Sequence, residues 1–346
     1  MIDWTTDHGT TTEYGLRTTD HGLRTTSGVS VSYTSKGREN QIAIALARCA
    51  TSVKRADDSR WEFSLANGKP LGVSACLIED WLVFDALITN RITRGAWWDL
   101  LRLNAAVDGL SKFVLTPDED SQNLHLRAEI PLQEDEDSGD ECANKTDGGL
   151  TTRVLETCAG LKAAFRSFRG ESFVEHQVPA SFETLEGRDP KPAEELRRLC
   201  GDSGWRFIER SEGRLMIELD VRRGFYQAAV EQRPAGAEIV VEIASSDALT
   251  ETSRQALSLL LLGTGALVKL ARPSIVQTGE QVSIRFEVKF VSTPTAAELA
   301  HAFSSLSVAC ALSGQEARVL QDEATARDYL AILGAQTSIS ASYASD

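Results

Sequence analysis

The chain has 346 residues, of which 42% are hydrophobic and 25% are charged, and its formal net charge is −14 at pH 7. This length exceeds one ordinary hydrophobic core and suits two domains of about 130 to 150 residues each. The negative charge argues against nucleic acid as the main ligand, because phosphate contacts need a concentrated basic face.

The spacing of the cysteines and the length of the apolar runs indicate in which cellular compartment the protein is expected. The six cysteines show no C-x-x-C spacing, and the first residues lack the apolar core of a secretory signal. The longest apolar run, residues 257–262, is far shorter than the ~20 residues that span a bilayer. We therefore expect reduced thiols, a cytoplasmic protein and no association with a membrane.

Residues 1–38 are rich in Thr, Gly and Ser and repeat the pentapeptide Thr-Thr-Asp-His-Gly at 5–9 and 18–22. No periodic apolar residues accompany the repeat, so the segment is predicted to be a flexible tail. The two Asp-His pairs lack a third fixed ligand, and no metal site is expected there.

Apolar spacing after the tail predicts a first α+β unit. Trp61, Phe63 and Leu65 alternate with polar residues, and Asn67-Gly68 is typical of a hairpin turn. The predicted order is a helix at 40–54, strands at 61–65, 73–77 and 81–88, a helix at 95–109, strands at 113–115 and 124–130, and a helix at 154–168.

A similar order of elements follows downstream. The predicted elements are a helix at 190–200, strands near 205–207, 215–221 and 238–243, a buried helix at 250–262, strands near 267–270 and 284–288, and a helix at 299–310. Three landmarks match in sequence order: Trp61 with Trp205, Lys112 with Lys269, and Arg127 with Arg285. Residues 222–237 are interpreted as a longer connection in the second copy.

The predicted division of the chain has five parts. They are a tail (1–38), a first domain (39–170) with an acidic loop (133–147), a linker (171–189), a second domain (190–313), and a C-terminal helix and tail (314–346). The acidic loop contains the run Glu134 to Asp137. It is interpreted either as a loop that increases solubility or as a segment that attracts a basic partner.

This order of helices and strands, with its paired landmarks, resembles the class I chaperones of type III secretion and the related YbjN-like domains. The resemblance implies two tandem copies of a unit built as helix, three-strand meander, helix, two strands and helix. It also implies that the copies form a pseudo-dimer within one chain, through the second helix and neighbouring strands. Such proteins bind an extended partner polypeptide on apolar grooves, without a cofactor or chemistry.

The residues themselves indicate no catalytic constellation. The five histidines, at 8, 21, 125, 176 and 301, have no metal-ligand spacing. Gly263-Thr264-Gly265 follows a helix and is interpreted as a helix stop, because phosphate-binding loops follow a strand.

Two functions therefore stay open. The first is a non-enzymatic, chaperone-like or adaptor protein that binds a protein or peptide on an apolar groove. Candidate partner-binding residues are Trp81, Trp97, Trp98, Leu259 and Leu261, for which core packing is the alternative. The second is a small-molecule-binding or hydrolytic enzyme with a site between the two domains. The oligomeric state is left open.

Overall fold

The computed structural model describes residues 31–66, 69–90, 92–117, 122–132, 147–170, 192–211, 214–221, 224–234 and 236–343. These residues form seven α-helices, one short 3-10 helix and two antiparallel six-stranded sheets, so the fold class is α+β. Glu39–Asp346 form one compact unit. The Thr-Thr-Asp-His-Gly repeat, most of the acidic loop and the predicted linker lie outside the described residues.

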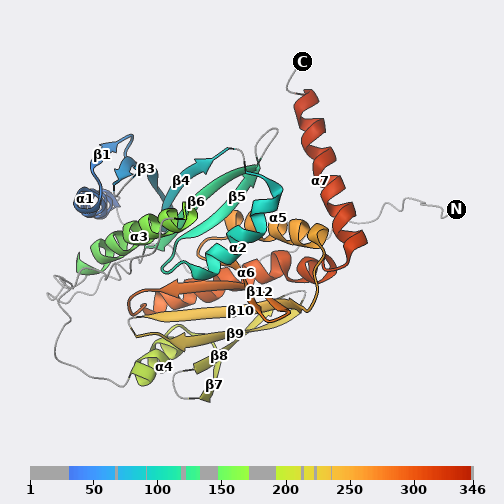
Figure 1. Cartoon of the computed structure of the whole chain (residues 1–346). Coiled ribbons are helices and arrows are strands. Elements are labelled where there is room, and N and C mark those ends of the chain that lie inside the picture. Colours follow the sequence, from blue (N-terminus) through green and yellow to red (C-terminus); the bar gives the residue numbers. More distant parts are fainter. Residues whose placement is uncertain are drawn as a thin grey trace, which may run out of the picture. The chain divides into compact units, whose positions relative to one another are not determined.

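The first sheet contains six strands in the order β1-β2-β3-β4-β6-β5. Its strands are β1 (Ser52–Arg55), β2 (Arg60–Leu65), β3 (Leu71–Ile78), β4 (Trp81–Thr89), β5 (Lys112–Pro117) and β6 (Gln122–Pro131). Its helices are α1 (Val31–Cys49), the 3-10 helix η1 (Arg94–Ala96), α2 (Trp97–Ala106) and α3 (Asp147–Phe168). α3 packs against β6, as Figure 1 shows.

The second sheet has the order β11-β12-β10-β9-β8-β7, which is the order of the first sheet when read from its other end. Its strands are β7 (Phe207–Ser211), β8 (Arg214–Val221), β9 (Gly224–Gln232), β10 (Ala237–Ser246), β11 (Arg272–Thr278) and β12 (Gln281–Phe290). The helices around it are α4 (Pro192–Asp202), α5 (Glu251–Leu267), α6 (Ala296–Val319) and α7 (Glu323–Tyr343). α6 packs across β8, β9, β10 and β12 (Figure 1).

Each meander has four strands, so the three strands expected from the sequence were one too few. The predicted helix at 40–54 is wrong at both ends, because α1 begins at Val31 and ends at Cys49, and Ser52–Arg55 form β1. All four residues of β1 are exposed, so this strand has no alternating pattern to reveal it.

The connection predicted at 222–237 is also wrong, since most of it is strand β9. Tyr226, Ala228 and Val230 of β9 are buried. Alanine and glutamate have low strand propensity, and Val230 is the only β-branched residue of this run, so the usual signal of a strand is weak.

The strand positions show that two of the three predicted landmark matches are wrong. Trp61 lies in β2, the second strand of its meander, whereas Trp205 precedes β7, the first. Lys112 begins β5, whereas Lys269 lies in the turn before β11. Arg127 and Arg285 do occupy corresponding strands, β6 and β12.

The glycines after the leucine run do not stop the helix, because α5 continues through Gly263 and Gly265 to Leu267. A Cβ atom added at Gly265 would lie 2.8 Å from Cδ of Pro273 and 3.3 Å from Cγ1 of Val114. Gly265 therefore permits close approach of α5 to β5 and β11, a different use of glycine from the predicted one.

The last two helices are longer than predicted. α6 continues to Val319 and α7 begins at Glu323, so the boundary near 313–315 falls inside a continuous helix. α6 begins with a capping box in which Thr295 Oγ1 accepts the Glu298 N–H (3.2 Å) and Glu298 Oε2 accepts the Thr295 N–H (2.8 Å).

The buried apolar side chains of both sheets belong to one continuous cluster. In β4, Leu82, Phe84 and Ala86 point into this cluster, while Val83 and Asp85 lie on the other face. Among the described helices, α6 alone is long and apolar enough to cross a membrane, but half of its apolar window is buried against the rest of the fold. That degree of burial is typical of a core helix.

Candidate functional site

The middle helices α2 and α5 lie side by side where the two sheets meet (Figure 1). α2, from the first set of elements, packs mainly against β11 of the second sheet. α5, from the second set, packs mainly against β5 of the first sheet. We call this region, made by α2, α5, β5, β11 and the adjoining turns, the seam.

A buried lysine and glutamate form the first ionic contact of the seam. Lys112 Nζ lies 3.1 Å from Glu129 Oε1, and both side chains are almost inaccessible. The same ammonium donates to the Val268 carbonyl at 2.6 Å, and Glu129 Oε2 accepts the Leu270 N–H at 3.2 Å. Burial lowers the pKa of Lys112, and the nearby carboxylate of Glu129 opposes that effect.

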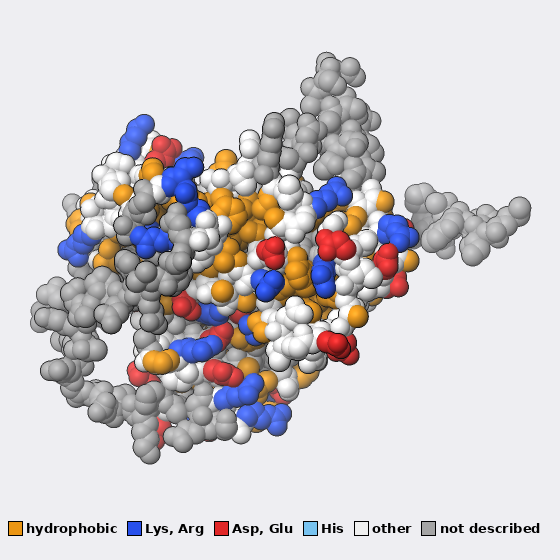
Figure 2. Space-filling view, viewed as in Figure 1, with side chains coloured by type: hydrophobic (Ala, Val, Ile, Leu, Met, Phe, Trp, Pro, Cys, Tyr) orange, Lys and Arg blue, Asp and Glu red, His pale blue; other side chains and the backbone are white. Residues whose placement is uncertain are grey.

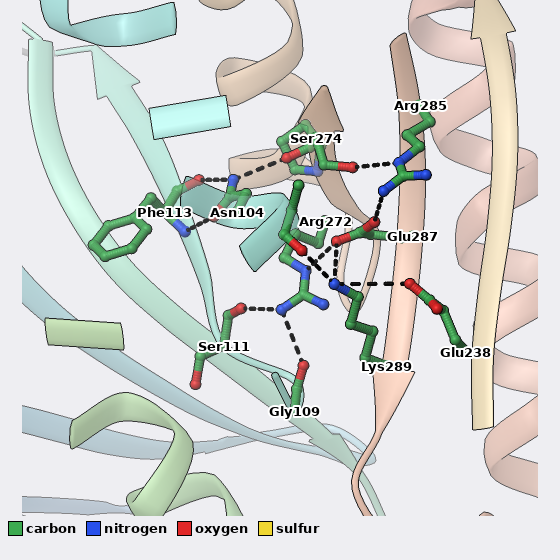
Figure 3. A network of polar contacts seen from close by, with 12 residues as sticks. Asn104, Gly109, Ser111, Phe113, Glu238, Arg272, Ser274, Arg285, Glu287 and Lys289 are labelled. Carbon is green, nitrogen blue, oxygen red and sulfur yellow. Dashed lines mark hydrogen bonds and ion pairs between the residues drawn. The ribbon is translucent and has the colours of Figure 1, made fainter. Parts of the chain in front are cut away.

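A second buried ionic cluster lies on the second sheet, on the other side of the seam. Arg272 Nε and Lys289 Nζ lie 3.2 Å and 3.1 Å from Glu287 Oε1, whose side chain is fully buried. Arg272 Nη1 donates to the carbonyls of Gly109 and Ser111, at 3.1 and 2.9 Å. Burial lowers the pKa of Arg272, and the carboxylate of Glu287 counteracts it. Figure 3 shows these residues converging from β11, β12 and the turn after α2.

Each middle helix also receives a cation near its C-terminal end from the opposite sheet. Arg127 Nη1 donates to the Ala266 carbonyl of α5 at 2.8 Å, and Lys289 Nζ donates to the Ala105 carbonyl of α2 at 2.6 Å. These last-turn carbonyls lack an intrahelical partner and carry the negative end of the helix dipole. The contacts across the seam are therefore reciprocal.

Asn104 joins the two edge strands. Its Nδ2 donates to the carbonyls of Phe113 in β5 (3.0 Å) and Pro273 in β11 (2.9 Å). Its Oδ1 accepts the Phe113 N–H at 2.7 Å. One fully buried amide thus bonds both sheets (Figure 3).

Away from the seam, Arg153 of α3 holds the start of α6. Its guanidinium makes two contacts of 2.7 Å with the carboxylate oxygens of Glu298 and a third of 3.0 Å with the Thr293 carbonyl. Burial opposes the charge on Arg153, but Glu298 and Glu156 outweigh it and raise its pKa. This bidentate pair fixes the outer helix of one sheet to that of the other.

The structure places the five sequence-predicted binding residues at or near the seam. Leu261 is fully buried and Trp97 is 3% exposed. Trp81, Trp98 and Leu259 are partly buried and pack against the core cluster. His301 of α6 meets the Trp81 ring edge-on at 5.2 Å, and the Arg254 guanidinium lies 5.8 Å from the Trp98 ring. Figure 2 shows apolar side chains gathered in the middle of the viewed face, where Figure 1 has β5, α2 and α5.

Sequence reasoning missed a polar cluster on the face of the first sheet opposite Phe84 and Leu126. Asp85 accepts from Arg127 Nε at 3.0 Å and lies 2.8 Å from His125 Nδ1. Burial raises the pKa of Asp85, but the bonds and charges of His125 and Arg127 outweigh burial and lower it overall. Apolar and polar residues alternate in β4 and β6. This pattern already indicated that Asp85, His125 and Arg127 lie together on the face opposite Phe84 and Leu126.

A second missed feature is the outward face of α6. Val308, Leu312 and Val319 are 49%, 48% and 49% exposed. Their spacing of four and seven residues aligns them within about 40° on the helix surface. Ser304 and Gln315, which fall on the same face at 100° per residue, are exposed and uncharged. Arg318, next to Val319, is exposed and charged, but it lies about 80° around the helix from Val308 and its Nε donates to the Ile243 carbonyl at 3.1 Å. We call Val308, Leu312 and Val319 the apolar stripe of α6.

The charged groups of the seam form ion pairs with one another, and Lys112, Arg272 and Lys289 also donate to backbone carbonyls. In the part of the chain that the structure describes, no three His, Cys, Asp or Glu side chains gather as a metal site would require. No family model, curated protein or solved structure matches the chain.

Proposed function

We propose that the chain is a non-enzymatic, chaperone-like adaptor, built as an intramolecular pseudo-dimer, that binds a partner polypeptide on the apolar stripe of α6. The pseudo-dimer is supported by the matching strand orders of the two sheets and by the reciprocal packing of α2 on β11 and α5 on β5. This is the association that the resemblance to tandem chaperone-like domains implies.

The observation that carries the binding role is the stripe of Val308, Leu312 and Val319. α6 buries its other face against the second sheet, so its inner side already supplies the packing that the fold needs. The outward row of large apolar side chains is not needed for this packing, and such rows are typical of surfaces that receive a helix or an extended apolar segment.

The candidate residues Trp97 and Leu261 are too buried to reach a partner without opening the seam. Their side chains belong to the buried apolar cluster that the two sheets share. We therefore place the main contact on α6 and leave Trp81, Trp98 and Leu259 as partly exposed residues at the seam. The internal pairing of the seam charges favours a binding role over the alternative of an enzyme with a site between the halves.

The test replaces two members of the stripe. The full-length chain, the double variant Val308→Asp/Leu312→Asp and the control Ile332→Asp are each used to capture partners from cells of the native source. Ile332 of α7 is 60% exposed, so the control adds charge at another exposed apolar position.

We expect one defined polypeptide to bind the wild type and the control, with at least a tenfold loss of affinity in the double variant. A photo-crosslinker at residue 312 should attach to that same polypeptide. If the double variant retains full affinity, or the crosslinker at 312 captures nothing that binds, the stripe is not the binding surface.

A further inference from the structure

The C-terminal end of α1 lies against the middle of α3 and brings two cysteines together (Figure 1). Lys162 Nζ of α3 donates to the carbonyl of Cys49, the last residue of α1, at 3.0 Å. Cys158 precedes Lys162 by four residues, which places it one helical turn away on the same side of α3. The thiols of Cys49 and Cys158 are close enough to share a hydrogen bond. We call these two residues the thiol pair.

The two members of the thiol pair differ in their access to solvent. Cys158 is fully buried in the apolar cluster, whereas Cys49 is partly exposed and packs against that cluster. Cys49 Sγ donates to the Leu46 carbonyl at 3.4 Å, so its lone pairs remain to accept the Cys158 S–H. A small oxidant from the solvent therefore reaches Cys49 first and finds a second thiol beside it.

The surroundings also make Cys49 the more reactive thiol. The hydrogen bond from Cys158 lowers the pKa of Cys49, burial opposes this effect, and the ammonium of Lys162 lowers the pKa further. The shared hydrogen bond and burial raise the pKa of Cys158. The thiolate is the nucleophilic form of cysteine, so attack on an oxidant begins at Cys49, and Cys158 keeps its proton until the second step.

From this arrangement we infer that Cys49 and Cys158 form a redox modification site, at which a peroxide converts the two thiols into a reversible disulfide. In the first step the Cys49 thiolate attacks one peroxide oxygen. An S–O bond forms, the O–O bond breaks, and hydroxide leaves with the electron pair of the broken bond. The product is the sulfenic acid of Cys49, whose sulfur has been oxidised by two electrons.

In the second step the Cys158 sulfur attacks the sulfur of this sulfenic acid. An S–S bond forms, the S–O bond breaks, and a second hydroxide leaves. The two hydroxides take up the two thiol protons, so one hydrogen peroxide and two thiols give one disulfide and two molecules of water. The inference does not depend on the proposed role of α6.

The other described cysteines provide internal controls. Burial raises the pKa of Cys200 and of Cys310 to about 12, so both thiols stay protonated near neutral pH. Cys76 of β3 is partly exposed, as Cys49 is, and its Sγ donates to the Leu77 carbonyl at 3.7 Å. Cys76 therefore matches Cys49 in exposure and not in its surroundings.

The experiment oxidises the full-length chain with hydrogen peroxide near neutral pH, alkylates the remaining thiols and maps the disulfides by peptide mass spectrometry. We expect one intramolecular disulfide, between residues 49 and 158, which dithiothreitol reduces completely. The oxidised protein should unfold several degrees above the reduced protein, because a cross-link that fits the folded state restricts the unfolded chain.

Three single variants assign the roles of the thiols. In Cys158→Ala, Cys49 should accumulate as the sulfenic acid, which dimedone traps, because the second thiol is absent. In Cys49→Ser, Cys158 should react with peroxide at least tenfold more slowly than Cys49 does in the wild type. Cys76→Ser, the matched control, should form the disulfide between residues 49 and 158 at the wild-type rate.

Three results would overturn the inference, and each can be read from the wild-type protein alone. They are the absence of a disulfide between residues 49 and 158 after oxidation, the formation of a disulfide by another pair of cysteines in equal or higher yield, and unfolding of the oxidised protein at a lower temperature than the reduced protein. The last result would mean that the cross-link strains the fold.

Discussion

Individual buried charges in this protein depend on neighbours that are distant in the sequence. Glu129 accepts a backbone N–H from Leu270, and Arg272 donates to carbonyls at 109 and 111. An unpaired ion in such a position costs several kcal/mol, whereas a paired and hydrogen-bonded one is close to neutral. These residues therefore favour one specific arrangement of the two sheets more than they add to stability.

Asp85 is the clearest case for a pH-dependent contribution at the residue scale. Its pKa lies below the ordinary value of 3.8, so folding favours the ionised carboxylate. The stabilisation is fully present above the ordinary pKa and is lost as the pH falls through the lower, folded pKa.

We expect Asp85→Asn to lower the free energy of unfolding by on the order of 1 kcal/mol near neutral pH, since the site is partly exposed. The difference from wild type should shrink between about pH 5 and about pH 3 in urea titrations. Asp99→Asn is the control. The Asp99 side chain is 74% exposed, and its nearest basic atom, Arg102 Nη1, lies 3.7 Å away, so this ion pair is weak. A difference for Asp85→Asn that stays constant with pH would contradict this assignment.

At the scale of elements, the contacts of α5 are the most informative. The helix passes so close to β5 and β11 that Gly265 leaves no space for a side chain. Two residues earlier, Gly263 has no other atom within 4 Å of an added Cβ. The two glycines share one helix but face different surroundings, which makes them a matched pair.

We expect Gly265→Ala to destabilise the protein by about 1 to 3 kcal/mol, because the added methyl group would overlap Pro273. Gly263→Ala should be neutral or stabilise by up to about 1 kcal/mol, since alanine is the better helix former. Urea-induced unfolding of both variants measures the difference. Equal effects at the two positions would mean that α5 does not approach the edge strands so closely.

On the scale of the whole molecule, the two sheets share one apolar core and exchange their middle helices. Separation of the halves would expose α2 and α5. It would also break the hydrogen bonds that Lys112, Glu129 and Arg272 make to the backbone of the other half. Both consequences are unfavourable, so the seam should hold the halves together without a covalent connection.

We therefore expect residues 1–180 and 181–346, produced in the same cells as two chains, to purify as a one-to-one complex. Each piece expressed alone should be insoluble or should associate with itself through the exposed helix. Size-exclusion chromatography with mass determination distinguishes these outcomes. Two soluble, separate monomers would show that the halves are independent domains.

The sequence by itself determined the α+β class and the position of most helices, because these depend on local periodicity. Alternation in residues 61–65 and spacing in residues 154–168 are properties of single elements, and both predictions held. β1 and β9 were missed because one is exposed throughout and the other is built partly from weak strand formers.

Only the tertiary structure decided how residues more than a hundred positions apart would meet. The pairs between residues near 105–129 and residues near 266–289 follow from the exchange of α2 and α5, which no local pattern encodes. Periodicity reports which face of an element is buried, but the partner of that face is set by the packing of the whole chain.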